Sequence, residues 1–170
     1  MDTSNSMPDD APRGREWLVD TMAGQAQAID LLVEMAGERI QLFDIDLSQA
    51  GWSGTKRAEA LARFLRRRHA QFDVIVHDTR WIEAHAPRFV MLLRQFGHAM
   101  TLYRTGAEAR SAMDPLLLVD RRHYLHRFHA DQPRASAAVE APQSAKPLVA
   151  RFEEIWSTGE PGLAGTVLGL

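Results

Sequence analysis

Charged side chains that could bind an anion follow the apolar segments of the chain. Asp78, Arg80 and His85 come after the β-branched run 74–76, and Arg104 ends the next such segment. In open α/β sheets, ligands bind beyond the carboxyl ends of the strands, and a guanidinium group binds phosphate through charge-assisted hydrogen bonds. We therefore predict an anion-binding crevice. The alternative is that Asp78 caps the following turn and that the arginines pair with acids structurally.

Three other acidic residues could likewise either bind a ligand or have only a structural role. Asp44 and Asp46 end the segment 39–46 and could line the same crevice. Asp120 ends the apolar run 116–119, and we include it among the ligand-binding candidates. The alternative is that Asp120 caps the hairpin that follows it.

Histidines are densest between residues 123 and 129. On a strand, His123 and His129 share one face about 20 Å apart, and His126 takes the other face. One metal ion cannot be bound by all three, so we expect partly exposed strand histidines, no metal site and no cofactor. His85 and His123 are the candidates for a catalytic base.

A run of arginines lies on a predicted helix, and a second group lies near the hairpin. These residues are Arg63, Arg66, Arg67 and Arg68, and then Arg121, Arg122 and Arg127. Such a run is usually a solvated face, although together the two groups could form a basic patch that contacts phosphates. The formal net charge of -2 and the lack of an aromatic platform make nucleic acid an improbable partner.

The elements that must position these residues alternate along the chain. Hydrophobic periodicity predicts helices at 17–38, 55–69, 87–97 and 146–156, strands at 39–46, 74–76 and 100–103, a hairpin of 116–120 with 123–128, and an edge strand at 135–141. Alternation followed by a hairpin predicts an α/β fold whose mixed sheet is sandwiched between helices.

Composition indicates one folded domain. The chain has 170 residues, 45% hydrophobic and 25% charged, and no cysteine, which excludes disulfides and thiol chemistry. We expect a disordered leader at 1–15, a single domain at 16–158 and a flexible tail at 159–170. No segment approaches the roughly 18 apolar residues of a membrane span, and we expect a cytoplasmic protein.

The order of elements, the hairpin at Asp120 and the closing helix with Phe152 and Trp156 together resemble one half of the phospholipase D superfamily, over about residues 22–157. The chain looks most similar to uncharacterised bacterial domains of that superfamily that lack the catalytic signature. That signature is a His, one residue, a Lys, four residues and an Asp. With its Asp set on Asp120, Met113 stands in the place of the His and Pro115 in that of the Lys.

No His-x-Lys sequence occurs anywhere in the chain. Its two lysines, Lys56 and Lys146, are preceded two positions earlier by Gly54 and Ser144. In active members the resemblance implies a nucleophilic His, a second His as acid and Lys residues that hold the phosphate, supplied by two copies of the motif. It therefore also implies a homodimer.

Three functions follow as hypotheses. The first is a non-catalytic phospholipase D-like domain for binding or assembly, with an anionic small molecule or a protein as partner. The second is a phosphodiesterase or phosphotransferase with a reorganised site, in which His85 or His123 is the base and Arg104 holds the anion. The third is a nucleic-acid-associated domain that keeps only the charge pattern.

Overall fold

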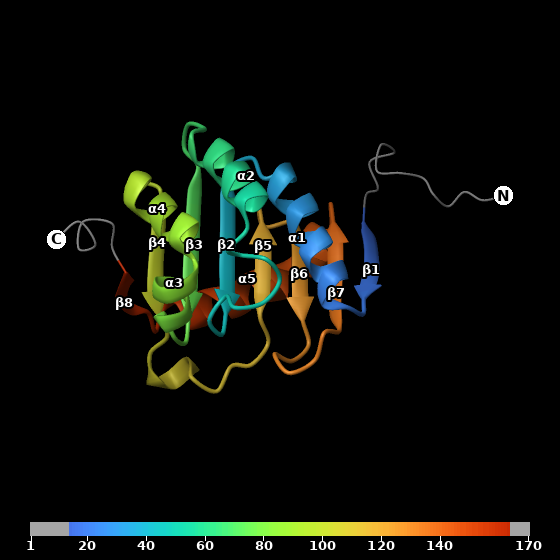
Figure 1. Ribbon diagram of the computed structural model, residues 1–170. Helices are drawn as coiled ribbons and strands as arrows, with labels where there is room; N and C mark the ends of the chain where they lie inside the picture. Colours follow the sequence, from blue (N-terminus) through green and yellow to red (C-terminus); the bar gives the residue numbers. More distant parts are fainter. Residues whose placement is uncertain (1–13, 164–170) are drawn as a thin grey trace.

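The computed structural model describes residues 14–163, in which a single mixed sheet carries helices on both faces (Figure 1). The elements are β1 (Arg15–Val19), α1 (Met22–Met35), β2 (Arg39–Asp44), α2 (Thr55–Leu65), β3 (Gln71–Val76), α3 (Arg80–His85), α4 (Pro87–Gln95), β4 (Met100–Arg104), β5 (Leu116–Val119), β6 (His123–Arg127), β7 (Ala135–Val139), α5 (Pro142–Trp156) and β8 (Glu160–Leu163). The sheet has eight strands in the order β1-β7-β6-β5-β2-β3-β4-β8. The predicted α/β fold with a mixed sheet between helices is confirmed.

Three parallel strands lie side by side in one half of the sheet. β2 pairs with β3 and β3 with β4, in the registers Leu42↔Val74 and Val74↔Leu102. Helices α1 to α4 cover one face of the sheet and α5 crosses the other (Figure 1). Residues on both sides of β3 are therefore buried, as the β-branched run predicted. The carboxyl ends of all three strands meet at one edge of the sheet.

The predicted helix 17–38 is wrong at its start. Residues Arg15–Val19 form β1, which pairs antiparallel with β7. Thr21 then caps α1, because its hydroxyl accepts a hydrogen bond from the Gly24 N–H at 2.9 Å. The apolar residues of β1 are followed at once by those of α1, so they fit a helical period, and only the distant β7 makes them a strand.

Two boundary predictions also need correction. β7 is not an edge strand, because β1 pairs with its outer side. β8 begins at Glu160, inside the segment expected to be a flexible tail, and pairs antiparallel with β4. An edge strand tolerates Pro161 because it has solvent on one side. Residues 1–13 of the expected leader and 164–170 of the expected tail lie outside the described residues, and Arg15 belongs to β1.

The β5–β6 hairpin is confirmed. Leu117 pairs with Leu125 and Val119 with His123. Asp120 and Arg121 have φ values of 52° and 58°, and the Arg122 N–H donates to the Val119 carbonyl at 3.1 Å. Two consecutive residues with positive φ are typical of a tight hairpin turn whose twist matches that of the strands.

The closing helix α5 is longer than predicted. It begins at Pro142, four residues before the expected start at Lys146, with proline in the first turn. Its Phe152 and Ile155 pack in a core with Phe43 and Ile75 on one face of the sheet. The larger core lies on the other face, beneath α1, α2 and α4. No helix within residues 14–163 is long and apolar enough to cross a membrane.

Candidate functional site at the carboxyl edge of the sheet

Three of the predicted ligand-binding residues lie close together beyond β3 and β4. The carboxylate of Asp78 accepts hydrogen bonds from the main-chain N–H of Arg80 at 2.9 Å and from its Nε at 3.0 Å. These bonds, and the charges of Arg80 and Arg104, lower the pKa of Asp78 to about 2. Arg104 also approaches Glu160, with 3.8 Å between Nη2 and Oε1. Both guanidinium groups are solvent-exposed, with side chains 88% and 47% accessible.

His85 lies on the adjacent helix and does not join this group. It is the last residue of α3, it is exposed, and its ring lies 5.9 Å from that of Trp81. No contact of His85 with Asp78, Arg80 or Arg104 occurs in the described part of the chain. Within residues 14–163 the structure therefore does not join His85 to the arginine pair.

Asp120 lies at the opposite edge of the sheet. Its carboxylate accepts hydrogen bonds from three consecutive main-chain N–H groups, those of Gly37 at 2.8 Å, Glu38 at 2.9 Å and Arg39 at 2.8 Å. Asp120 thus binds the start of β2. It does not share a crevice with Asp78, because adjacent strands β2 and β5 are antiparallel and the end of β5 meets the start of β2. Ligand binding by Asp120 stays a prediction.

The segment predicted to correspond to the catalytic signature leads into β5. Asp114 lies between Met113 and Pro115, and its carboxylate contacts His126 Nε2 at 2.8 Å and Arg151 Nη2 at 2.6 Å. Burial works against ionisation of Asp114, but the hydrogen bonds from His126 and Arg151, together with the charge of Arg151, lower its pKa well below the usual range. This segment is therefore tied to both β6 and α5.

His77 was not among the predicted site residues. Its Nδ1 lies 2.6 Å from Thr105 Oγ1 and its Nε2 lies 2.7 Å from the Ala112 carbonyl. Arg110 in turn donates to the Thr105 carbonyl at 2.9 Å. These contacts bind the β4–β5 connection to the end of β3. The only sequence signal was the place of His77 directly after β3.

Asp44 and Met113 share a polar pocket of about 200 Å³ at the same edge. Its lining also includes Asp46, Ser48, Gln49 and Asp131. On the inner side of Asp44, the buried Arg127 donates from Nε to the Gln132 carbonyl at 2.6 Å and from Nη1 to Gln49. Burial lowers the pKa of Arg127, and the charge of Asp44 opposes that shift. Met113, which takes the predicted place of the nucleophilic His, therefore borders a pocket that contains the carboxyl group of Asp44.

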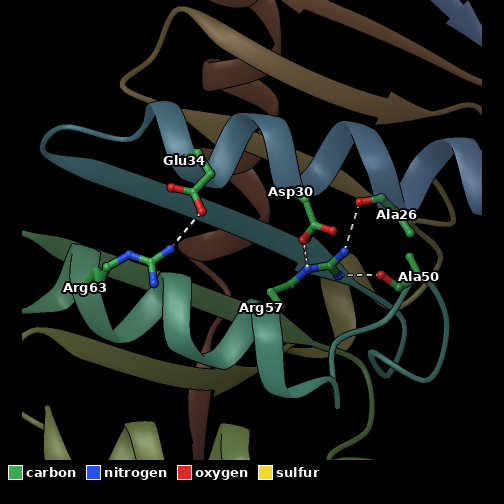
Figure 2. Close-up of polar contacts among 6 residues, drawn as sticks. All are labelled: Ala26, Asp30, Glu34, Ala50, Arg57 and Arg63. Carbon is green, nitrogen blue, oxygen red and sulfur yellow. Dashed lines mark hydrogen bonds and ion pairs between the residues drawn. The ribbon is translucent and has the colours of Figure 1, made fainter.

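The β2–α2 loop, whose residues line this pocket, is hydrogen-bonded to Arg57 of α2. Arg57 is buried, and its guanidinium group donates to the carbonyls of Ala50 and Ala26 and to the carboxylate of Asp30 (Figure 2). It also lies 4.8 Å from the ring centroid of Trp52. Arg57 thus joins α1, α2 and the β2–α2 loop in one polar cluster.

Asp44 should make stability depend on pH. Burial raises the pKa of Asp44 to about 6, and the charge of Asp46 adds to the rise, although the N–H groups of Ile45 and Leu47 donate to the carboxylate. Because the folded-state pKa exceeds the unfolded value, this group contributes stability that is complete below pH 4 and lost as pH rises through about 6.

We compare the free energy of unfolding of Asp44→Asn with that of the natural chain. We expect this difference to be about 1–3 kcal/mol more favourable to the variant at pH 8 than at pH 4. Urea unfolding at both pH values measures this change. Asparagine does not titrate, so effects of the substitution that do not depend on pH cancel when the two pH values are compared. Equal differences between the two chains at pH 4 and pH 8 would contradict the prediction.

The remaining candidate histidines are separated. His123 is buried, and its Nδ1 accepts a hydrogen bond from the Glu140 N–H at 2.9 Å, while burial lowers its pKa. His129 lies 3.7 Å from Asp131. In the region from 14 to 163, no three or more His, Cys, Asp or Glu side chains are grouped as they would be around a metal ion.

Comparisons with known proteins agree with this architecture. Residues 21–164 match the family model described as "Domain of unknown function (DUF7931)", and no curated protein matches the chain. Among solved structures, the phospholipase D family member Nuc from Salmonella typhimurium has a TM-score of 0.63 at 10% identity, covering 89% of this chain and all of Nuc. NucT from Helicobacter pylori has a TM-score of 0.59 at 10% identity, covering 88% of this chain and all of NucT.

A third similar structure is TrmBL2, described as an archaeal chromatin protein with a novel mode of DNA binding. Its TM-score is 0.66 at 12% identity, and the match covers 94% of this chain. The chain spans only 56% of the length of TrmBL2. At these identities the likenesses show the fold alone, and those to Nuc and NucT show that it is phospholipase D-like.

Proposed function

Because the chain belongs to the DUF7931 family and has a phospholipase D-like fold, we propose that it is a non-catalytic domain for binding or assembly that recognises an anionic, phosphate-bearing ligand. The observation that carries this proposal is the segment Met113–Pro115. With the Asp of the signature set on Asp120, a thioether and a pyrrolidine ring take the places of the imidazole and the ammonium group that the covalent mechanism needs. The acid between them is already paired with His126 and Arg151.

The arginine pair beyond β3 and β4 is the proposed binding surface. Arg80 and Arg104 are exposed and close enough to Asp78 that both charges lower its pKa. An anion with several oxygens can accept hydrogen bonds from two guanidinium groups at once. Asp78 orients Arg80 through a bidentate contact, in which Nε donates to Oδ1 and Nη2 donates to Oδ2.

The test combines binding with the absence of turnover. We expect inorganic phosphate at millimolar concentration to shift the NMR signals of Arg80 and Arg104, and the double variant Arg80→Gln/Arg104→Gln to bind about tenfold more weakly. Arg63→Gln is the control, because it removes an exposed arginine in a different ion pair, with Glu34. It should bind as the natural chain does.

The same samples test catalysis. We expect no hydrolysis of a chromogenic phosphodiester and no phosphohistidine by mass spectrometry. Hydrolysis that survives purification and is lost in His85→Ala or His123→Ala would favour the second hypothesis, a phosphodiesterase with a reorganised site. Signals of Arg80 and Arg104 that do not respond to phosphate would instead remove the binding surface.

A nucleic-acid-associated domain is the second candidate, and one observation favours it. Arg66, Arg67 and Arg68 are consecutive and exposed in the α2–β3 connection, and no ion pair of theirs occurs within residues 14–163. TrmBL2, which has a similar fold, is described as binding DNA. If this candidate holds, glutamine at all three positions should abolish binding to DNA, and the affinity should fall steeply with salt.

A further inference from the structure

Strand β1 is an outer strand of the sheet, and no other strand within residues 14–163 pairs with its free side. In the described chain the outer strands are β1 and β8. β8 contains Pro161, and proline is one of the devices that prevent an edge strand from pairing with another chain. β1 contains no proline, and it exposes 60% of Leu18. The two edges therefore differ in their capacity to accept a further strand.

The hydrogen bonds to β7 determine which groups of β1 are free. The Arg127 N–H donates to the Pro115 carbonyl before β5, and the Phe128 N–H donates to the Arg134 carbonyl before β7. Because the main-chain groups of successive residues point to opposite sides of a strand, Ser136 and Ala138 direct theirs at β6, whereas Ala135, Ala137 and Val139 direct theirs at β1. Their partners Val19, Trp17 and Arg15 therefore direct their main-chain groups at β7, and Glu16 and Leu18 direct theirs away from the sheet.

The side chains of β1 alternate between the two faces. Trp17 packs against the core under the α1 face, whereas Glu16 accepts a hydrogen bond from Ser144 of α5 on the other face. Leu18 therefore lies on the α5 side with Glu16. On the α1 side, Trp17 borders a groove of about 390 Å³ whose lining includes Gln27 and Leu31, and Leu31 is 41% exposed.

We propose that β1 pairs antiparallel with β1 of a second copy, about a two-fold axis through Trp17, so that the two sheets become continuous. In this register Trp17 faces Trp17 and Arg15 faces Val19 of the second copy. Glu16 then lies opposite Leu18 of the second copy, so the outward main-chain groups of both residues gain hydrogen-bonded partners. An isologous contact of this kind closes at two copies.

The charge of Glu16 favours this register over the adjacent one, in which the two-fold axis passes through Leu18. With the axis through Trp17, Glu16 lies opposite Leu18 of the second copy. With the axis moved to Leu18, Glu16 would lie opposite Asp20, and like charges directly opposite each other destabilise a strand pair. The Trp17 register also covers the exposed Leu18 side chain and lays a second Trp17 beside the groove on the α1 face.

The experiment compares two charges at one exposed position. The natural chain should be a dimer at tens of micromolar by light scattering. Leu18→Glu introduces a carboxylate opposite Glu16 at two symmetric places and should weaken dimerisation about tenfold or more. Leu18→Lys introduces an ammonium group at the same places and should keep the dimer. Met91→Lys on α4, at a side chain 56% exposed, is the control and should also keep it.

Hydrogen exchange tests the same pairing without any substitution. The amides of Glu16 and Leu18 should exchange more slowly as the protein is concentrated, whereas those of Arg15, Trp17 and Val19, which face β7, should not change. A monomer at tens of micromolar, exchange at the Glu16 and Leu18 amides that does not depend on concentration, or a dimer unaffected by Leu18→Glu would overturn the proposal. Equal loss of the dimer in Leu18→Glu and Leu18→Lys would overturn the register. Phosphate binding by Arg80 and Arg104 does not enter these measurements, so the two proposals can fail separately.

Discussion

Replacing Arg57 with alanine is expected to lower the free energy of unfolding by about 3–5 kcal/mol. The side chain is only 4% exposed, and its guanidinium group bonds to Asp30 at 2.8 Å, to the Ala26 carbonyl at 3.0 Å and to the Ala50 carbonyl. Alanine leaves both carbonyls without this donor and opens space beside Trp52. Urea unfolding of the natural chain and the variant measures the loss.

Arg57→Lys separates charge from shape. An ammonium group keeps the positive charge, but it cannot direct a planar fork of donors at three acceptors on α1 and the β2–α2 loop. We therefore expect a loss of about 1–3 kcal/mol for lysine. Recovery of the full stability by lysine would show that charge alone matters at this position.

The matched control lies two turns along α2. Arg63 donates to Glu34 on α1 at 2.9 Å, but these side chains are 58% and 59% exposed (Figure 2). An exposed ion pair contributes about 0–1 kcal/mol, so Arg63→Ala should change stability by no more than that. Similar losses at Arg57 and Arg63 would contradict the role assigned to burial.

The Arg57 variants should also affect the pocket at the carboxyl edge. Arg57 holds Ala50, and Asp46 and Gln49 of the same loop line the pocket beside Met113, together with Asp44 at the end of β2. A variant that still folds should therefore show altered NMR signals in this loop. Signals of Arg80 and Arg104, which lie beyond other strands, should change little.

Asp120→Ala is expected to destabilise the fold by about 2–4 kcal/mol. Its carboxylate is the acceptor for the N–H groups of Gly37, Glu38 and Arg39 at the start of β2, all within 2.9 Å. Hydrogen bonds to a charged group are stronger than neutral ones, and alanine removes all three. Thermal and urea unfolding measure the effect.

Asp120→Asn and Arg121→Ala complete this comparison. Asparagine tolerates the positive φ of 52° and keeps one carbonyl oxygen, so we expect a loss of about 1–2 kcal/mol. Arg121 has nearly the same backbone conformation, with φ of 58°, but its ion pair with Glu153 is exposed. Its replacement by alanine should cost less than about 1 kcal/mol. A loss at Arg121 as large as that at Asp120 would assign the effect to the turn rather than to the carboxylate.

Local patterns were sufficient for much of the fold. The β-branched run of β3, the apolar period of α2 and the short turn between β5 and β6 each depend on residues near one another in the chain. Their helices, strands and hairpin were therefore predictable from the sequence, as was the mixed sheet between helices. The same holds for the position of charged residues directly after β3 and β4, because strand ends can be located locally.

Only the tertiary structure decided which strands pair at the edges and which polar groups meet. β1 is a strand because β7 lies beside it, more than a hundred positions along the chain, and a helical period could not reveal that. Asp120 was expected beside a ligand, yet its partners are N–H groups 81 to 83 positions away. In the sequence, Arg57 is one of several arginines of an amphipathic helix, and only the packing of α1 against α2 makes it a buried residue. Hydrogen bonds and burial between distant segments depend on the whole fold, so residue type and local spacing cannot specify them.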